Sequence, residues 1–324
     1  MQSEAEFQKL IEERLSNLEI GSNPSNLYEP IRYMISLGGK RLRPLLTILC
    51  NQLFDGNFED VINPALGIEI FHNFTLLHDD IMDNAPLRRS HETVHTKWNS
   101  NIAILSGDSM FVIACSLMMK VKTEYVKEVM DCFLQTAQKV CEGQQYDMDF
   151  ENQNGITIED YMNMNSMKTA SLLGCSCYIG AICSSASKED AQHLYEFGKH
   201  LGIAFQLQDD ILDVYGEKNK FGKQVGGDIL SNKKTFLLLT AFNESDNQTK
   251  SELLKWTNST DFNPEKKIEA VVAIYQQLGI KEKAIEKKNY FMNCALAELE
   301  KVNVSSKRKK DLLEFAERLM KRER

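Results

Sequence analysis

The stretch LYEFGKHLGIAFQLQDDILD (residues 194–213) carries mostly apolar residues at intervals of three and four positions. The repeating positions are Leu194, Phe197, Gly198, Leu201, Ala204, Phe205, Gln208, Ile211 and Leu212. This spacing puts the side chains on one face of an α-helix, whereas a half-buried strand alternates at every second residue. The stretch therefore predicts a long amphipathic helix.

The prolines divide the chain unevenly. They are Pro24, Pro30, Pro44, Pro64, Pro86 and Pro264. Proline disrupts a helix interior at a cost of about 3 kcal/mol, so the long interior without proline suits long helices. Alternating strand patterns are hard to find, and polar clusters at residues 21–26, 151–155 and 243–248 separate the helical blocks. We therefore predict an all-α fold, a helical bundle formed by a single domain over residues 1–324.

The composition limits the class of protein. Of the 324 residues 43% are hydrophobic, enough for a sizeable core, and the net charge of −8 argues against non-specific binding to nucleic acid. The eight cysteines include no CxxC pair. The charged N-terminus differs from a signal peptide, and the longest uncharged runs are too short or too polar to span a bilayer. We expect a cytoplasmic protein with reduced thiols and no transmembrane segment.

Two acidic stretches share the pattern DDxxD. The first, LLHDDIMDNAPLRR at residues 76–89, contains Asp79, Asp80 and Asp83. The second, FQLQDDILD at residues 205–213, has four polar residues at the spacing of one helical stripe, Gln206, Asp209, Asp210 and Asp213. A solvated helix face explains one such motif equally well, but two copies in apolar sequence favour a metal site. Two stripes facing each other across a bundle would form a cage of oxygen atoms, which suits Mg²⁺.

Basic residues accompany the acidic stretches. GGKRLRP (residues 38–44) has a glycine turn before a predicted helix start, with Lys40, Arg41 and Arg43 after it. The other basic residues near the motifs are Arg88, Arg89, Lys168, Lys223 and Lys233. A glycine turn with cations can bind an anion, although a helix cap followed by surface charge explains GGKRLRP as well. A diphosphate held by Mg²⁺ and these cations would neutralise both carboxylate clusters.

In this order the motifs resemble those of the trans-prenyl diphosphate synthases, which elongate isoprenoid chains head to tail. The resemblance covers about residues 30 to 240, through GGKRLRP, HNFTLLHDDIMD with RR, GDSMF, KTA, FQLQDDILD, GK and NKKT. It departs after the arginine pair, where the family usually has a glycine and then Pro-Thr, and this chain has Ser90, Glu92 and Thr93. The resemblance implies a bundle of the isoprenoid synthase type around a central active-site cavity, and a homodimer.

The resemblance also implies a reaction and its residues. The family ionises an allylic diphosphate with the help of Mg²⁺, and isopentenyl diphosphate then attacks the carbocation and loses a proton. The implied metal ligands are Asp79, Asp83 and Asp209, with Asp80, Asp210 and Asp213 near the metal through water. The residues implied for isopentenyl diphosphate are Lys40, Arg43, His72 and Arg89. Those implied for the allylic diphosphate and its cation are Arg88, Lys168, Thr169, Gln206, Lys223 and Lys233.

Product length is expected to depend on the helix face that precedes the first acidic motif. One and two turns before Asp79 lie Thr75 and Phe71, with Phe74 beside them. A bulky ring there would act as a floor that stops the growing chain. In the family, two aromatics at the positions of Phe74 and Thr75 tend to give the shortest products, and two small residues give long ones. The arrangement here predicts geranylgeranyl diphosphate, with farnesyl diphosphate as the alternative, unless the floor lies elsewhere, for example on Ser109–Met119.

Three other classes of protein remain open. A terpene cyclase shares the fold and the first motif, but its second metal motif normally reads Asn or Asp, then Ser or Thr, then Glu. A carboxylate-bridged di-iron bundle would need two Glu-x-x-His motifs, of which Glu69–His72 is one. A non-catalytic partner subunit tends to lose an acidic motif, whereas both are intact in this chain.

Overall fold

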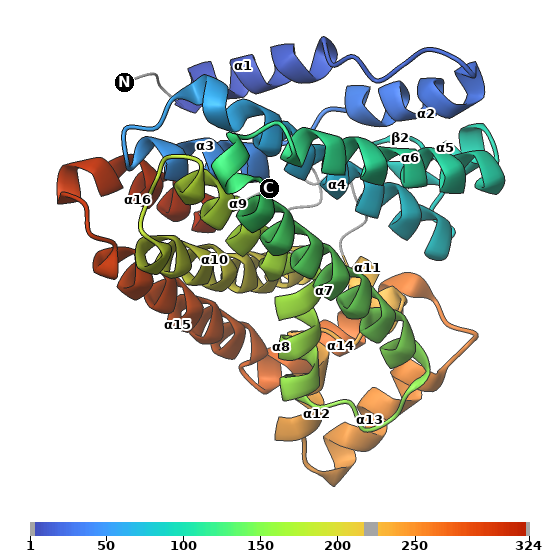
Figure 1. Ribbon diagram of the computed structural model, residues 1–324. Coiled ribbons are helices and arrows are strands. Elements are labelled where there is room, and N and C mark those ends of the chain that lie inside the picture. Colours follow the sequence, from blue (N-terminus) through green and yellow to red (C-terminus); the bar gives the residue numbers. More distant parts are fainter. Residues whose placement is uncertain (1–3, 217–225, 322–324) are drawn as a thin grey trace. The chain divides into compact units, whose positions relative to one another are not determined.

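The computed structural model describes residues 4–216 and 226–321, and helices form almost all of the regular structure (Figure 1). The predicted all-α fold is confirmed. Within these two ranges the strands are limited to β1 (Leu87–Arg88) and β2 (His91–Glu92), which form one antiparallel hairpin. The chain forms two compact units. That residues 1–324 make a single domain stays a prediction.

The first unit comprises the described residues up to Gln135 together with Cys175–Tyr195 and Lys301–Leu312. Besides the β-hairpin, its complete elements are α1 (Glu4–Ser16), α2 (Ser25–Ser36), α3 (Leu42–Gln52), α4 (Phe58–Met82), α5 (Val94–Lys97), α6 (Ser100–Met118) and the 3₁₀ turn η1 (Thr123–Tyr125). The helices with residues in both units are α7 (Val126–Asn152), α9 (Ser171–Ile182), α10 (Lys188–Tyr215), α15 (Ile280–Lys301) and α16 (Ser306–Met320).

Helix α4 is the central element of the first unit, because apolar residues occur on almost every side of it. It packs against α3 and α6, and α2 packs against α6. The buried apolar side chains of α4 are Val61, Ile62, Ala65, Leu66, Ile68, Ile70, Phe71 and Leu77. Each large one stabilises the fold by about 1.5–3 kcal/mol relative to an exposed position. The helix begins at the N-cap Asn57, whose side chain accepts a hydrogen bond from the Glu59 N–H, and it ends in the first acidic motif.

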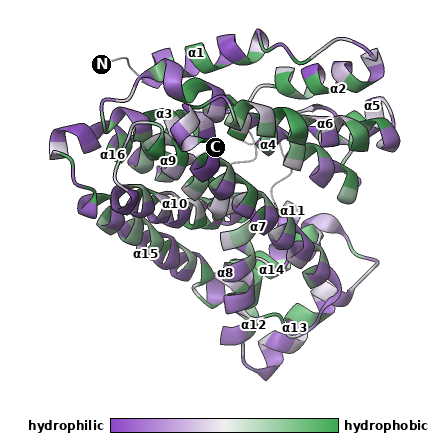
Figure 2. Cartoon of the chain, in the orientation of Figure 1, coloured by the Kyte–Doolittle hydropathy of each residue, from purple (hydrophilic) through white to green (hydrophobic). Residues whose placement is uncertain are grey.

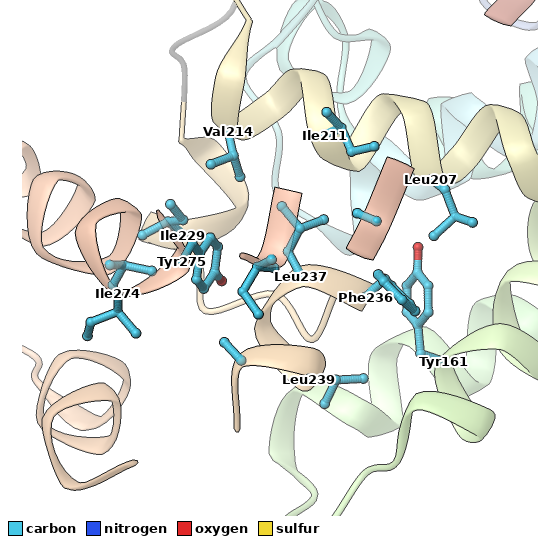
Figure 3. Close-up of a cluster of buried hydrophobic side chains, with 14 of the residues drawn as sticks. Tyr161, Leu207, Ile211, Val214, Ile229, Phe236, Leu237, Leu239, Ile274 and Tyr275 are labelled. Atoms are coloured by element: carbon cyan, nitrogen blue, oxygen red, sulfur yellow. The ribbon is translucent and has the colours of Figure 1, made fainter. Parts of the chain in front are cut away.

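The second unit comprises Thr136–Gly174, Glu196–Glu300 and the described residues from Leu313. Its complete elements are α8 (Ile158–Asn165), the π-helical turn η2 (Ser166–Ala170), α11 (Gly227–Leu230), α12 (Phe236–Glu244), α13 (Asn247–Asn258) and α14 (Pro264–Gln277). Figure 3 shows part of its core, where Leu207, Ile211 and Val214 of α10 lie over Leu237 of α12. The hydroxyl of Tyr161 points toward α10 in the same view. This core fixes the helix that carries the second acidic motif.

Helix α10 confirms the prediction made from residues 194–213. It runs from Lys188 to Tyr215, and Leu194, Phe197, Leu201 and Ala204 on its apolar face are fully buried. The proline-free interior also contains α7 with 27 residues and α6 with 19 residues. Proline is nevertheless no reliable boundary in this chain, because Pro30 and Pro64 lie inside α2 and α4.

Helix α6 exposes several large apolar side chains, and it is largely coloured hydrophobic in Figure 2. Its buried side includes Met110 and Leu117, whereas Leu105, Val112 and Met119, seven residues apart, are about 60% exposed (60%, 63% and 58%). Among the described helices, α6 is the one that is long and apolar enough, by length and composition, to cross a membrane. A core helix of a soluble protein passes the same test, and 39% of this segment is buried.

Candidate active site

The first acidic motif lies at the C-terminal end of α4. Asp79 and Asp80 belong to its last turn, and Asp83 is the C-cap, whose N–H donates to the carbonyl of Asp79 at 2.9 Å. Asp79 and Asp83 are therefore one helical turn apart, as the sequence predicts. Asp80 differs from both because it is only 2% exposed. The three aspartates thus divide into two that are accessible to solvent and one that is buried.

Arg88 supplies the positive charge beside the buried aspartate. Its Nε donates to Oδ1 and Oδ2 of Asp80 at 2.9 and 2.8 Å, and its Nη2 lies 2.7 Å from Oδ1. The same Nη2 is 3.7 Å from Oδ2 of Asp79. Burial raises the pKa of Asp80, and the arginine opposes this shift without cancelling it. Arg88 therefore makes the buried carboxylate tolerable before any ligand is bound.

The hairpin β1–β2 carries both arginines of the pair. Arg88 pairs with His91, and the two residues between them, Arg89 and Ser90, form the turn with φ angles of 52° and 65°. Two consecutive left-handed residues are typical of a type I′ turn, which favours glycine. Ser90 thus occupies a left-handed position where the family usually has glycine. Thr93 is buried, and its hydroxyl donates to the carbonyl of Ala85 at 2.7 Å.

The glycine turn of GGKRLRP lies under the second arginine. Gly38 and Gly39 have φ angles of 76° and 150°, and α3 begins three residues later at Leu42. A Cβ atom added at Gly39 would lie 3.0 Å from Nη2 of Arg89, so the guanidinium lies directly against this turn. Lys40 is exposed at the end of the turn. A larger residue at position 39 would push Arg89 away.

His72 lies among the same cations. Burial lowers its pKa well below the usual range, and Arg43, Arg89, Arg88 and Arg41 lower it further. The structure therefore brings together three of the four residues predicted for isopentenyl diphosphate, namely Arg43, His72 and Arg89. The histidine and the two arginines lie in the first unit, and that they bind an anion stays a prediction.

Arg41 has a structural role, which separates it from its neighbours Lys40 and Arg43. It is 3% exposed, and its guanidinium binds Glu69 at 2.7 Å and Glu12 of α1 at 2.8 Å. The carboxylate of Glu69 is thereby committed to Arg41, which argues against the di-iron interpretation of Glu69–His72. A second Glu-x-x-His spacing, Glu92–His95, starts on strand β2 rather than on a helix.

An aromatic cluster lies beside the helix face predicted to limit product length. Phe71 is fully buried, and its ring centroid is 5.5 Å from that of Phe74, 6.0 Å from Phe111 and 5.2 Å from Phe133. Phe74 also contacts Phe111 at 5.7 Å, and the hydroxyl of Thr75 donates to the carbonyl of His72. Phe111 belongs to Ser109–Met119, the segment named above as the alternative. Phe111 could be identified only from the packing of α4 against α6, which the sequence does not predict.

The second acidic motif lies on α10 in the second unit. Asp209 and Asp213 are partly exposed, whereas Asp210 is 3% exposed. Asp210 accepts hydrogen bonds from the hydroxyl of Tyr161 at 2.5 Å and from the amide of Gln206 at 3.0 Å. Burial, and then the charge of Asp228, raises the pKa of Asp210 to about 7. Both acidic motifs therefore bury their middle aspartate.

Lys168 and Thr169 lie in the π-helical turn η2, directly before α9. Helix α7 approaches this turn closely, because a Cβ atom at Gly143 would lie 2.4 Å from the backbone nitrogen of Lys168. The hydroxyl of Thr169 donates to Oε1 of Gln206 at 3.3 Å. π-helical turns are rare in proteins, and those that occur often lie at functional sites. The position of the two residues therefore agrees with their predicted role.

Asp147 of α7 is a further candidate site residue, which the sequence did not single out. Its Oδ2 lies 2.6 Å from the ammonium of Lys168. Burial would raise the pKa of Asp147, but the charges of Lys233 and Lys168 outweigh it and lower the pKa. The carboxylate therefore lies near both lysines predicted to bind the allylic diphosphate. In the sequence, Asp147 is one polar residue among several on a long helix. Such a pattern is equally typical of a helix face exposed to solvent.

The two lysines of NKKT have different surroundings. The backbone N–H of Lys233 donates to the carbonyl of Asp228 at 2.9 Å. The positive charge of the Lys233 ammonium lowers the pKa of Asp147. The ammonium of Lys234 instead donates to three carbonyls near the end of α7, those of Phe150, Glu151 and Gln153. Lys234 is thus occupied by the backbone, which leaves Lys233 as the candidate ligand. Lys223 lies outside the described residues.

The donors suit a hard cation, although neither motif encloses one. In the ranges that the structure describes, no group of three His, Cys, Asp or Glu side chains could hold a metal ion. The candidate ligands Asp79, Asp83 and Asp209 offer only carboxylate oxygens. Mg²⁺ uses one or two carboxylates and fills the rest of its shell with water and phosphate, so these residues fit it. That the two motifs share one metal cluster stays a prediction.

Comparison with known proteins identifies relatives along most of the chain. The model of the polyprenyl synthetase family matches residues 24–275. A geranylgeranyl diphosphate synthase from Methanosarcina mazei is 40% identical over 223 residues, which cover 68% of this chain and 69% of the relative. A short chain isoprenyl diphosphate synthase from Methanocaldococcus jannaschii is 38% identical, over 76% of this chain and 75% of the relative.

The fold has a counterpart among the solved structures. A crystal structure of a geranylgeranyl pyrophosphate synthase superposes with a TM-score of 0.95 at 38% sequence identity. The match covers 99% of both chains.

Proposed function

Because the chain belongs to the polyprenyl synthetase family, a family of prenyltransferases, we propose that it joins isopentenyl diphosphate head to tail to an allylic diphosphate in a Mg²⁺-dependent reaction. The observation that supports this most directly is the setting of the two DDxxD motifs. Each buries its middle aspartate and has a cation from another element nearby, Arg88 at Asp80 and Lys233 at Asp210. Acidic and basic groups in alternation are what a metal-bound diphosphate requires.

We assign the metal to Asp79, Asp83 and Asp209. When bound, Mg²⁺ neutralises the diphosphate and makes it a good leaving group. The other aspartates act on the protein itself: Asp80 holds Arg88, and Oδ2 of Asp213 accepts a hydrogen bond from the N–H of Asp228 at 2.9 Å. We therefore propose that Asp80, Asp210 and Asp213 do not bind the metal directly. They support the site through water molecules or through the backbone.

Isopentenyl diphosphate is assigned to the cations around the glycine turn. Lys40, Arg43 and Arg89 supply positive charge for its diphosphate, and the neutral imidazole of His72 can donate one hydrogen bond. Because the pKa of His72 is held low, the ring remains uncharged near neutral pH. The diphosphate therefore meets a directional donor there.

The allylic diphosphate is assigned to Arg88, Lys168, Lys223 and Lys233. Beside it, the oxygens of Thr169 and Gln206 face each other at 3.3 Å and can stabilise the carbocation by their dipoles. The amide nitrogen of Gln206 donates to Asp210, so its carbonyl oxygen is directed toward Thr169. The released diphosphate accepts the proton, and no side-chain base is required.

We propose geranylgeranyl diphosphate as the product, with farnesyl diphosphate as the alternative. The activity named for the Methanosarcina mazei relative supports this, as does the contact of Phe74 with Phe111. Phe74→Ala should lengthen the product and Thr75→Phe should shorten it, because the ring limits the depth available to the tail. Phe111→Ala extends the test to the facing helix. Chromatography of the dephosphorylated products measures the chain length. Unchanged products in all three variants would mean that other residues stop the growing chain.

We propose a cytoplasmic homodimer that covers the exposed face of α6. Leu105, Val112 and Met119 repeat every seven residues, so a second copy of the chain can bury them along the whole helix. Val112→Glu should then yield monomers in sedimentation equilibrium, while Thr260→Glu, at an exposed position outside α6, serves as a control. Wild-type protein that sediments as a monomer, or that floats with lipid vesicles, would contradict the dimer.

The activity test uses radiolabelled isopentenyl diphosphate with dimethylallyl, geranyl or farnesyl diphosphate, in Mg²⁺ and again in excess EDTA. Transfer of label into a longer diphosphate in Mg²⁺ alone supports the proposal. Release of a cyclic hydrocarbon would indicate a terpene cyclase, and no reaction with any primer would indicate a non-catalytic subunit.

A further inference from the structure

Lys267 of α14 is a buried cation without an acidic partner among its contacts. Its side chain is fully buried, at 0% exposure. The ammonium donates to Oδ1 of Asn232 at 2.7 Å and to the carbonyl of Leu230 at 3.4 Å, and it lies 4.1 Å from the ring centroid of Phe262. All three partners are uncharged, and burial lowers the pKa of Lys267. Lysine is almost never fully buried in this way.

Stability does not explain this lysine. An apolar side chain of similar length would avoid the desolvation of an ammonium, and replacing buried charges by apolar residues is often neutral or stabilising. Both hydrogen bonds of the Lys267 ammonium go to one short segment, which indicates that the ammonium determines the position of that segment.

The segment in question runs from Gly226 to Lys233 and is fixed at both ends. At its start, the N–H of Gly226 donates to the carbonyl of Asp213 at 2.7 Å, and that of Asp228 donates to Oδ2 of Asp213. At its end, Lys267 binds the carbonyl of Leu230 and the side chain of Asn232. Asn232 has φ of 56°, a left-handed conformation that reverses the chain directly before Lys233.

Lys267 and Lys233 also line the same cavity. This cavity measures about 10 Å³, which is room for a single water molecule. Its other polar lining residues include Asp228, Asn232 and Tyr275. Lys267 is therefore linked to Lys233 through Asn232, and both residues border the same small cavity.

We propose that Lys267 is a positioning residue that fixes the chain at Asn232 and so directs Lys233 to a diphosphate group. The proposal rests on the proposed function in that the diphosphate belongs to the allylic substrate. Lys267 itself touches no substrate and acts only through Lys233.

The test combines two ways of breaking the same contact with one matched control. Lys267→Met removes the ammonium and keeps the length of the side chain, and Asn232→Gly removes the acceptor while allowing the left-handed backbone. Lys266→Met changes the exposed neighbouring lysine on the same helix. Each variant, and each combined with Lys233→Ala, is titrated with inorganic diphosphate and Mg²⁺ by calorimetry, and its thermal midpoint is recorded.

The expected result is a Kd for diphosphate about tenfold higher in Lys267→Met and in Asn232→Gly, with an unchanged or higher thermal midpoint for Lys267→Met. Lys266→Met should bind as the wild type does. In the Lys233→Ala background neither variant should weaken binding further, because the group through which they act is gone.

Unchanged affinity, or losses that add to that of Lys233→Ala, would overturn the proposal. A drop in thermal midpoint with unchanged affinity would assign Lys267 to stability and would equally contradict it. The calorimetry does not depend on turnover, so a wild type that binds diphosphate but transfers no prenyl group would refute the proposed function and leave the comparison of variants valid. In kinetic assays the KM for the allylic substrate should rise about tenfold, while the KM for isopentenyl diphosphate stays unchanged.

Discussion

The middle aspartates of the two DDxxD motifs are held in opposite ways. In the first unit, Asp80 is bound by the guanidinium of Arg88, with its Nη2 2.7 Å from Oδ1. In the second unit, Asp210 is bound by two neutral donors, the hydroxyl of Tyr161 and the amide of Gln206. One pattern of three aspartates therefore has its middle carboxylate hydrogen-bonded once to a cation and once to neutral donors. The charge of Lys233 also acts on Asp210, but less strongly than the two donors.

This difference shows that the two motifs have different requirements for an added cation. The first unit already carries its compensating charge in Arg88, whereas burial raises the pKa of Asp210 to about 7. A carboxylate held by neutral donors gains more from a nearby cation than one that is already paired. The second motif is therefore the one whose charge balance depends more on its ligands.

The largest effect is expected from removing a proposed metal ligand in either unit. Asp79→Ala and Asp209→Ala should each lower kcat by about 1,000-fold with the fold intact, because each loses stabilisation of the leaving diphosphate. Asp261→Ala, at an exposed position, is the control. Steady-state kinetics at saturating Mg²⁺ measures the effect. Near-normal activity in one variant would show that only the other motif serves the metal.

The comparison itself is tested by breaking each buried contact. Arg88→Met should destabilise the protein by about 3 kcal/mol, because it leaves Asp80 buried without its charge partner. Tyr161→Phe should cost only about 1 kcal/mol, because Asp210 keeps the donor Gln206. Urea denaturation measures both.

Arg14→Met breaks an exposed pair with Glu59 and should stay within about 0.5 kcal/mol of the wild type. Equal losses in Arg88→Met and Tyr161→Phe would remove the distinction between a cationic and a neutral setting.

The sequence predicts the first unit's site better than the second's, and the reason is physical. Arg88 follows Asp80 by eight residues, so the charge partner is visible within one stretch. The partners in the second unit come from α7 and α8, and neither Tyr161 nor Asp147 stands out on its own helix. Helical spacing predicts which residues share a face, but it does not predict which helices pack together. For the same reason the sequence did not identify Phe111, although it indicated the segment Ser109–Met119 that contains this residue.

The burial of His72 among the cations of the first unit also predicts a dependence of stability on pH. In the folded protein the pKa of His72 lies well below 6.5, so below this pH the unfolded chain takes up a proton that the folded chain does not. Stability is therefore present above the unfolded pKa and is lost as the pH falls. Relative to His72→Gln, the wild type should lose about 1 kcal/mol between pH 7 and pH 5.5.

Denaturation of both proteins at the two pH values gives this difference. Lost packing in His72→Gln is the same at both pH values and cancels. A difference that does not change with pH would mean that neither burial nor the arginines lower the pKa of His72.

The smallest effect is expected at the turn that carries Arg88 and Arg89. Ser90 adopts φ of 65°, a left-handed conformation that costs a side chain about 1 kcal/mol and costs glycine little. Glycine also makes the unfolded chain more flexible, which offsets part of this gain. Ser90→Gly should therefore stabilise the protein by only about 0.5 kcal/mol, whereas Ser116→Gly inside α6 should destabilise it by a similar amount. Thermal denaturation of the two variants gives the signs. If Ser90→Gly is destabilising, the serine side chain makes a contribution that outweighs the strained backbone, and the departure from the family's glycine at this turn is then favourable in this chain.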